Sequence, residues 1–367
     1  MLRMTARRTW RFFETFTTQA DHMLPPDNFQ EDPSPVLARR TSPTNIGLYL
    51  LCTASAHDFG WTGLADTVAR LEATFATLET MPRYRGHFYN WYATDDLSPL
   101  DPVYVSSVDS GNLAGHLIAL ASTCQKWRDN APQADTWREG ITDALNIAMT
   151  DLTFHNGARL TNTVPERQLL RLLTGLKNAV LSTRDGSEAQ LASLHRHATM
   201  AAEHAGQMHP TPPGGNSDGI ADRLFWVSAP LRTLESHLRD LDGDLYATLP
   251  ARLDTLARRA REMAQEMDFR FLCNTSRKLL SIGYLVAEDA QDSNCYDLLA
   301  SEARLAVFFA IAKGDMPAHD WFRLGRSITP VKNGAALVSW SGRCSSTSCP
   351  RSSCARRWAA CCNRPTP

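Results

Sequence analysis

Apolar residues recur at every third or fourth position along most of the chain, which is the pattern of amphipathic helices. In residues 62–81 one such stripe is formed by Leu64, Val68, Leu71, Phe75 and Leu78. The same pattern predicts further helices at 44–58, 109–127, 133–150, 165–183, 187–206, 220–240, 245–267 and 296–313. Strand candidates are few and short, namely HFYNWY at 87–92 and LLSIGYLV at 279–286. The pattern therefore predicts an all-α fold class.

The predicted helices show no exact sequence repeat at a period of roughly 33 to 47 residues, so a regular helical solenoid is not supported. Long loops rich in aromatic and polar residues separate them, and Pro/Gly-rich breaks fall at 24–35, 98–102 and 209–216. Many antiparallel helices joined by such loops predict a helical toroid, in which inner and outer helices alternate. The loops at one rim, with short β segments, would shape a cleft.

The composition is that of a folded globular protein, with 43% apolar and 21% charged residues among 367. The 38 Lys and Arg residues are balanced by 39 Asp and Glu residues, which argues against a nucleic-acid binder. No apolar run reaches the roughly 18 residues needed to cross a bilayer. The N-terminal sequence MLRMTARRTWRFF has no apolar segment of a secretory signal before Glu14. These observations predict a soluble cytoplasmic chain without a membrane segment.

The usual catalytic and metal-binding signatures are absent from the sequence. We find no G-x-G-x-x-G, P-loop, G-x-S-x-G or H-E-x-x-H motif. His195, His197 and His204 lie on a helix-like stretch without a recognised ligand spacing, so they are interpreted as a solvated face. The stretch DLDGDLY at 240–246 resembles the start of a calcium loop, but its twelfth position is Ala251 instead of glutamate. No metal and no cofactor are therefore expected.

Polar and aromatic residues gather in five loop segments. They are LPPDNFQED (24–32), RRTSPTNIG (39–47), RGHFYNWY (85–92), YVSSVDSGN (104–112) and NCYDLLASEAR (294–304). Aromatic rings stack on the apolar faces of sugars, and Asp, Asn, Gln and Arg side chains bond sugar hydroxyls in fixed directions. Each segment alone is equally consistent with a capped, well-packed loop, but five in one chain favour a polyhydroxyl ligand.

Glu302 is the residue that most specifically indicates a reaction. On the last predicted helix it shares one face with Leu298, Leu305 and Phe309. A carboxyl group among apolar side chains loses hydration, which raises its pKa and keeps it protonated near neutrality. That is the state of a general acid that protonates a departing glycosidic oxygen. The alternative is a structural role in which Arg304 or another base neutralises the carboxylate.

Several long segments closely resemble the central domain of cyclic β-1,2-glucan synthases. They are LPPDNFQED, RTSPTNIGLYLL, DFGW, RGHFYNWY, LDPVYVSSVDSGNLAGHLIAL, YDLLASEARLA, AKGDMPAHDWFRLGR and LVSWSG. The segments cover about 7–125 and 268–342, whereas about 130–265 resembles the family only in its helical character. Runs of this length are far more specific than a short catalytic motif.

The resemblance implies an (α/α)6 toroid, also described as glycoamylase-like, that acts on β-1,2-glucan. In the parent synthases this domain lies between a glycosyltransferase domain and a phosphorylase-like domain of a large inner-membrane protein, and it faces the cytoplasm. It performs retaining transglycosylation, cutting linear β-1,2-glucan and joining the new end to the other terminus, without metal or nucleotide. Glu302 in the SEAR motif matches a catalytic carboxylate, the implied general acid/base. The motif positions implied to line the glucan cleft are Asp27, Asn28, Gln30, Tyr89, Asn90, Trp91, Asp109, Asn112, Tyr296 and Asp297.

The resemblance ends after Gly342, where the character of the chain changes. Residues 343–367 contain no Asp, Glu, Leu, Ile, Val or Phe, and the spacing of their cysteines matches no usual zinc site. Arg343 to Pro350 can be back-translated as CGATGTTCGAGTACCTCATGCC, which from its third base encodes Met-Phe-Glu-Tyr-Leu-Met-Pro, similar to the family's continuation. We therefore hypothesise a partial domain at 1–342 followed by an out-of-frame, unstructured tail at 343–367. The nucleotide sequence tests this hypothesis.

The expected consequence is a fold that is incomplete at its C-terminus. A retaining mechanism needs two carboxylates about 5 Å apart, and by resemblance the second lies in a later motif that this chain lacks. We therefore expect a truncated β-1,2-glucan transglycosylase that is inactive alone. The alternatives are a hydrolase that recruits Asp109 or Asp297 as its second acid, a non-catalytic glucan-binding fragment, and a helical scaffold for protein partners.

Overall fold

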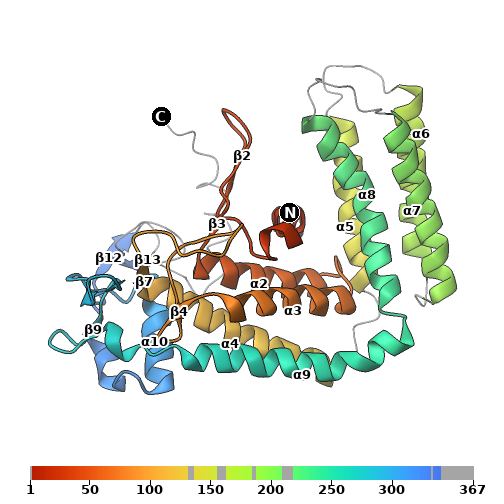
Figure 1. The fold of residues 1–367 in the computed structure, drawn as a ribbon. Helices are drawn as coiled ribbons and strands as arrows, with labels where there is room; N and C mark the ends of the chain where they lie inside the picture. The colour runs from red at the N-terminus through yellow and green to blue at the C-terminus, as the bar shows by residue number, and fades with distance from the viewer. Residues whose placement is uncertain are drawn as a thin grey trace. The chain divides into compact units, whose positions relative to one another are not determined.

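The computed structural model describes residues 2–130, 136–154, 163–183, 187–208, 218–331 and 334–339 (Figure 1). This part of the chain is mostly helical, with short strands of two to four residues in its loops. It divides into two compact units. The first unit comprises the described residues of Met1–Pro82, Tyr92–Ser98 and His116–Ala264, and the second unit those of Arg83–Trp91, Pro99–Gly115 and Gln265–Pro367.

The first unit is built from long helices. They are α1 (Leu2–Phe16), α2 (Pro43–Asp58), α3 (Leu64–Thr80), the C-terminal part of α4 (Ser107–Asp129), α5 (Thr136–Phe154), α6 (Val164–Ser182), α7 (Glu188–Met208), α8 (Asp218–Arg239) and most of α9 (Gly243–Glu266). Its loops hold a short 3-10 helix, η1 (Gln19–Asp21), and two antiparallel strand pairs. These are β1 (Phe29–Gln30) with β2 (Val36–Leu37), and β3 (Arg40–Thr41) with β6 (Tyr92–Ala93).

Helices α5, α6, α7 and α8 form a four-helix bundle in which each helix packs on two neighbours (Figure 1). The apolar stripes that the sequence predicts meet in the core of this bundle. Ile141, Leu145, Leu173 and Trp226 are fully buried there, and Leu194 is nearly so. Burial of one continuous stripe per helix is the reason that the 3.6-residue pattern located these helices.

The sequence pattern gave no prediction for α1, because arginines interrupt its apolar face. These arginines bind acidic side chains of the bundle. Arg3 Nε donates to Asp143 at 2.6 Å, and Arg8 Nη2 donates to Asp151 at 3.0 Å. Helix α1 therefore packs on α5 through ion pairs as well as apolar contacts, which a search for apolar stripes does not detect.

Arg7 on α1 is only 1% exposed, and its charge is balanced inside the first unit. Arg7 Nη1 lies 3.0 Å from Glu14 Oε2, and Arg232 Nε donates to Glu14 Oε1 at 3.0 Å. The Arg7 guanidinium also lies 5.2 Å from the ring centroid of Trp226, a cation–π distance. Burial lowers the pKa of Arg7, and the Glu14 carboxylate opposes that shift.

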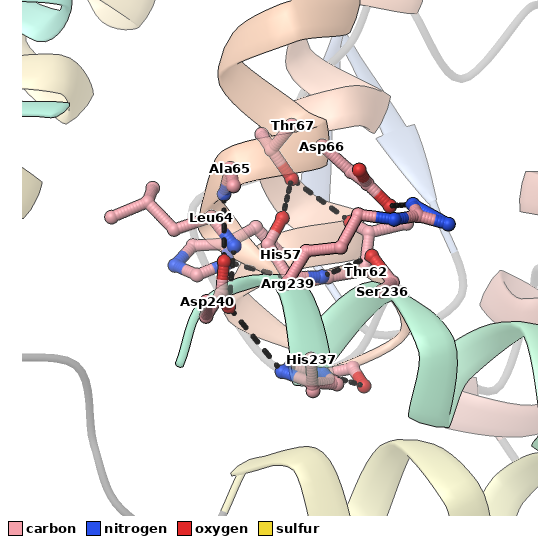
Figure 2. Close-up of polar contacts among 12 residues, drawn as sticks. His57, Thr62, Leu64, Ala65, Asp66, Thr67, Ser236, His237, Arg239 and Asp240 are labelled. Atoms are coloured by element: carbon pink, nitrogen blue, oxygen red, sulfur yellow. Dashed lines mark hydrogen bonds and ion pairs between the residues drawn. The ribbon is translucent and has the colours of Figure 1, made fainter. Parts of the chain in front are cut away.

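The C-terminal end of α8 binds the N-terminal end of α3 (Figure 2). The Asp240 carboxylate accepts hydrogen bonds from the backbone N–H groups of Leu64 and Ala65 at 2.9 and 2.8 Å. These donors have no acceptor within α3, so Asp240 supplies the cap that Gly63 cannot provide. Burial would raise the pKa of Asp240, but hydrogen bonds from His237 and from the two backbone amides hold it below its usual range.

The second unit contains the N-terminal part of α4, helix α10 (Arg304–Lys313) and two short 3-10 helices, η2 (Arg270–Leu272) and η3 (Ala318–Arg323). Its strands pair in antiparallel fashion. The pairs are β4 (Arg83–Tyr84) with β5 (His87–Phe88), β8 (Cys273–Asn274) with β9 (Leu279–Leu280), and β12 (Ile328–Val331) with β13 (Gly334–Leu337). A three-stranded sheet has the order β11 (Ala290–Gln291), β10 (Gly283–Leu285), β7 (Tyr104–Ser106).

Two glycines let α4 and α10 approach closely within the second unit. A Cβ atom at Gly111 would lie 2.3 Å from Ala306 Cβ and 2.4 Å from Ala306 Cα. A Cβ atom at Gly115 would lie 2.7 Å from Leu305 Cδ2. No side chain fits at Gly111 unless the two helices separate, so these glycines join the start of α4 to the start of α10.

We expect Gly111→Ala to lower the free energy of unfolding by about 1–3 kcal/mol, because its methyl group must displace the α10 backbone. Gly175→Ala on α6 is the matched control, since a Cβ atom there meets nothing within 4 Å. The control should gain up to about 1 kcal/mol from helix propensity. Urea unfolding measures both variants. A Gly111→Ala chain as stable as the native chain would contradict the close packing of α4 and α10.

The predicted all-α class describes most of the chain, and the predicted helices correspond to α2 through α9 within a few residues at their ends. The strand candidates at 87–92 and 279–286 are confirmed, but each is divided into two shorter strands. The first contains β5 and the start of β6, and the second contains β9 and β10. The helix predicted at 296–313 is wrong in its first part, because α10 begins only at Arg304. The loop at 209–216 and the tail at 343–367 lie outside the described residues.

Candidate functional site

Asp109 lies in the first turn of α4, and its backbone N–H donates to Ser106 Oγ at 3.2 Å. In the amide orientation that satisfies both of its polar atoms, Asn90 donates to Asp109 Oδ2 at 2.9 Å and accepts from Trp91 Nε1 at 3.0 Å. The backbone N–H of Asn90 donates to Tyr104 O at 2.7 Å. The loop after β5 therefore orients one Asp109 oxygen and ties the Trp91 ring to the same amide.

His87 anchors the other end of this loop. Its Nε2 lies 2.9 Å from the Asp268 carbonyl oxygen, and its Nδ1 lies 2.8 Å from Ser110 Oγ. Because a carbonyl can only accept, Nε2 carries the proton and Nδ1 accepts from the Ser110 hydroxyl. Burial lowers the pKa of His87 to about 4, which keeps this imidazole neutral. A buried neutral histidine thus connects the loop to the residue that follows Asp109.

Three carboxylates and two phenols gather within the second unit, and we call this group the acid cluster: Tyr104, Asp109, Asp292, Tyr296 and Glu302. Burial, followed by the nearby charges of Glu302, Asp109 and Asp292, raises the pKa of Tyr296 to about 12. Burial and the proximity of Asp292, Tyr296 and Asp109 also raise the pKa of Tyr104. A negative neighbour disfavours a phenolate, so both hydroxyls keep their protons. All five side chains are half-buried.

The acid cluster is assembled by contacts between residues far apart in the sequence. Ser107 at the start of α4 donates through its backbone N–H to Ile282 O at 3.0 Å and through Oγ to Ser281 O at 2.7 Å. Ser281 Oγ in turn donates to Asp292 O at 2.8 Å. The Asp292 carboxylate accepts from Asn294 N at 2.9 Å, in an Asx turn. The pairing of β7 with β10 therefore carries Asp292 and Tyr296 to the start of α4.

The segment before Glu302 is extended instead of helical. Leu298 pairs with Gly325 in an isolated bridge, and Ala300 pairs with Ser339 in another. Leu299 N donates to Gly325 O at 3.0 Å. These long-range hydrogen bonds replace the bonds to residue i−4 that a helix would require.

The predicted grouping of Glu302 with Leu298, Leu305 and Phe309 on one helix face is therefore wrong. Glu302 lies two residues before α10, where Ser301 Oγ accepts from Ala303 N at 3.1 Å. Its half-buried side chain lies close enough to Tyr296 to affect the phenol's charge. Glu302 thus belongs to the acid cluster, but through an irregular turn and not through helical periodicity.

Three further predicted residues lie in the second unit and are half-buried. Tyr89 precedes Asn90 in the loop that orients Asp109. Asn112 follows Asp109 by three residues on α4, which places both on one face of the helix. The Asp297 carbonyl accepts from Gly325 N at 2.6 Å, next to Tyr296.

The remaining predicted residues, Asp27, Asn28 and Gln30, lie in the first unit. Asp27 Oδ2 accepts from Arg40 at 2.9 and 3.1 Å and from the Asn28 amide at 3.1 Å. Asn28 and Gln30 are exposed. Their place beside the residues of the acid cluster remains a prediction.

Sequence reasoning missed Tyr104 and Asp292 as members of the cluster. Tyr104 stood in the polar segment at 104–112, which was singled out without a role for this residue. Asp292 lies just before the segment at 294–304 and belongs to no recognised motif. Its one local signal is its position two residues before Asn294.

Among the described residues, no group of three or more His, Cys, Asp or Glu side chains is arranged to hold a metal ion. His57 and His237 lie near Asp240, but each bonds a backbone carbonyl, Thr62 O at 3.2 Å and Gly60 O at 3.0 Å, as in Figure 2. No helix in the described ranges is both long and apolar enough to cross a membrane.

No family model matches the chain. The chain is 47% identical over 349 residues to cyclic β-(1,2)-glucan synthase NdvB of Rhizobium meliloti (strain 1021). This match covers 93% of the chain but only 12% of that protein, so the chain is homologous to a small part of the synthase. A crystal structure described as that of a glucoamylase from Bacteroides caccae ATCC 43185 is similar with a TM-score of 0.43 and 12% identity, over 93% of this chain and 57% of that one. The sequence match to the synthase confirms the resemblance to cyclic β-1,2-glucan synthases.

Proposed function

We propose that the acid cluster of the second unit binds β-1,2-glucan, and that Glu302 is the general acid/base of a retaining transglycosylation in the intact lineage. One observation carries the proposal: two protonated phenols and three carboxylates gather in a chain homologous to part of a β-1,2-glucan synthase. We also propose that the mostly helical fold is a partial (α/α)6 toroid. No cofactor or metal is part of the proposal.

The donor and acceptor chemistry of the cluster suits a sugar. The carboxylates of Asp109 and Asp292 accept hydrogen bonds from sugar hydroxyls, and the phenols can donate to them. The Trp91 indole, with its N–H bound to Asn90, offers a ring of fixed orientation for the apolar face of a glucose unit. Half-burial keeps these groups accessible while it strengthens each hydrogen bond relative to bulk water.

In the proposed reaction, Glu302 donates its proton to the glycosidic oxygen while the bond from that oxygen to C1 breaks. A second carboxylate forms the covalent glycosyl intermediate, and the hydroxyl at the other end of the glucan displaces it, returning a proton to Glu302. Tyr296 keeps its own proton beside Glu302 and can donate a hydrogen bond to the carboxylate that remains after proton transfer.

Isothermal titration calorimetry of the full chain tests the binding site. A β-1,2-linked glucose oligosaccharide should give heat, and a β-1,3-linked one of equal length should give less. We expect Asp109→Asn to weaken the affinity for the β-1,2-linked oligosaccharide about tenfold, because a hydrogen bond to a charged acceptor is lost. Asp289→Asn is the matched control, since exposed Asp289 bonds the Tyr284 hydroxyl outside the cluster. A folded native chain that gives no heat would contradict the proposal.

A second candidate, hydrolysis of β-1,2-glucan, is favoured by one observation: the Asp109 and Glu302 carboxylates both lie near enough to Tyr296 to raise the pKa of its hydroxyl. Asp109 would then serve as the second acid, which in a retaining enzyme lies about 5 Å from the first. A reducing-sugar assay on linear β-1,2-glucan distinguishes the candidates. Release of reducing ends that is lost in both Glu302→Gln and Asp109→Asn supports hydrolysis, whereas binding without release supports the first proposal.

A further inference from the structure

Tyr104 is fixed on both sides of its backbone. In the β7–β10 ladder it pairs with Leu285, and its carbonyl accepts from Asn90 N at 2.7 Å. Val286 N donates to Val103 O at 3.2 Å and extends the pairing by one residue. The position of the Tyr104 α-carbon is therefore set by β10 and by the loop that orients Asp109.

The ring of Tyr104 lies across the neighbouring strand at Gly283. A Cβ atom at Gly283 would lie 2.3 Å from both Cζ and Oη of Tyr104, so the hydroxyl end of the ring occupies the space of the missing side chain. The backbone of Gly283 is in an ordinary conformation, and the need for glycine here is therefore one of space. This arrangement places the Tyr104 hydroxyl at a defined point near Asp109, Asp292 and Tyr296.

The Tyr104 hydroxyl makes no hydrogen bond to any residue that the structure describes, although the side chain is half-buried. The hydroxyl groups of two other tyrosines on short strands do bond protein atoms. Tyr284 on β10 donates to Asp289 Oδ1 at 2.5 Å, and Tyr92 on β6 donates to Pro82 O at 2.7 Å. A hydroxyl that is held in place near carboxylates, and that bonds none of the described residues, is available to donate to or accept from a ligand.

We propose that Tyr104 is a substrate-binding residue whose hydroxyl bonds a sugar hydroxyl of β-1,2-glucan in the acid cluster. This inference rests on the proposed function of the cluster. The sequence motifs gave no individual role to this side chain. Its protonated phenol can donate one hydrogen bond and accept another, so it favours a hydroxyl group of the sugar over a C–H group at the same position.

Calorimetry with the full chain and a β-1,2-linked oligosaccharide tests the inference. Tyr104→Phe keeps the ring over Gly283 and removes only the hydroxyl, so we expect the affinity to fall about tenfold with an unchanged unfolding midpoint. Tyr284→Phe is the matched control on the adjacent strand, because its hydroxyl bonds Asp289. We expect it to bind as the native chain does.

The outcomes distinguish the proposed glucan site from the proposed role of Tyr104. If the folded native chain gives no heat, the proposed function fails, and this inference fails with it. If the native chain binds and Tyr104→Phe binds equally well, the inference alone is overturned. An equal loss in Tyr104→Phe and Tyr284→Phe would show a general effect on the sheet and would also overturn it.

Discussion

Glu14→Ala is expected to lower the free energy of unfolding by about 3–5 kcal/mol, because it leaves a buried arginine without its counter-charge. Arg7 is 1% exposed and lies 3.0 Å from Glu14. The same substitution removes the acceptor of Arg232, whose Nε donates to Glu14 at 3.0 Å. Two like charges would then face each other in the core of the first unit. Urea unfolding of the native and variant chains measures the difference.

The matched control is Glu262→Ala, which removes a glutamate whose Arg258 partner lies one helical turn away on α9. Both side chains of this pair are more than half exposed, at 53% and 61%, so the pair should contribute no more than about 0.5 kcal/mol. A Glu14→Ala chain that is destabilised as little as Glu262→Ala would contradict the description of Arg7 as a buried, paired charge.

His87 is expected to make the fold less stable as the pH falls from about 6.5 to 4. The unfolded chain binds a proton on this imidazole near pH 6.5, whereas the folded chain does so only near pH 4. The unfolded state therefore holds more protons between these values, and stability rises with pH across that window. The full effect is about 3 kcal/mol, at roughly 1.4 kcal/mol per pKa unit.

His87→Gln should reduce the loss of stability between pH 7 and pH 4.5 by about 2 kcal/mol, whatever its effect at pH 7. His197→Gln is the control, because His197 is exposed on α7 and its Nδ1 lies 2.9 Å from Ser193 O of the same helix. Urea unfolding at several pH values gives the slopes. Parallel pH profiles for the native chain and His87→Gln would contradict a buried neutral His87.

Most helices could be predicted from the sequence, and the two exceptions have physical causes. Helix α1 was missed because its buried face includes charged Arg7, whose charge is balanced by Glu14. The segment at 296–303 was predicted as helix because its local pattern is amphipathic. Bridges to Gly325 and Ser339 override that local preference.

The candidate site could be predicted only where a motif marks it. The family resemblance identified Glu302, Asp109 and Tyr296, which the structure brings together in the second unit. It gave no role to Tyr104 or Asp292, because their proximity depends on contacts such as that between Ser107 and Ser281, which are 174 residues apart. No local pattern carries such information.

An experimental structure of the chain with a bound β-1,2-linked glucose oligosaccharide would show whether the acid cluster is the glucan site. We expect sugar hydroxyls within hydrogen-bonding distance of Asp109 and Tyr296, with a glycosidic oxygen beside Glu302. An oligosaccharide bound only to residues of the first unit, with these three side chains untouched, would contradict it.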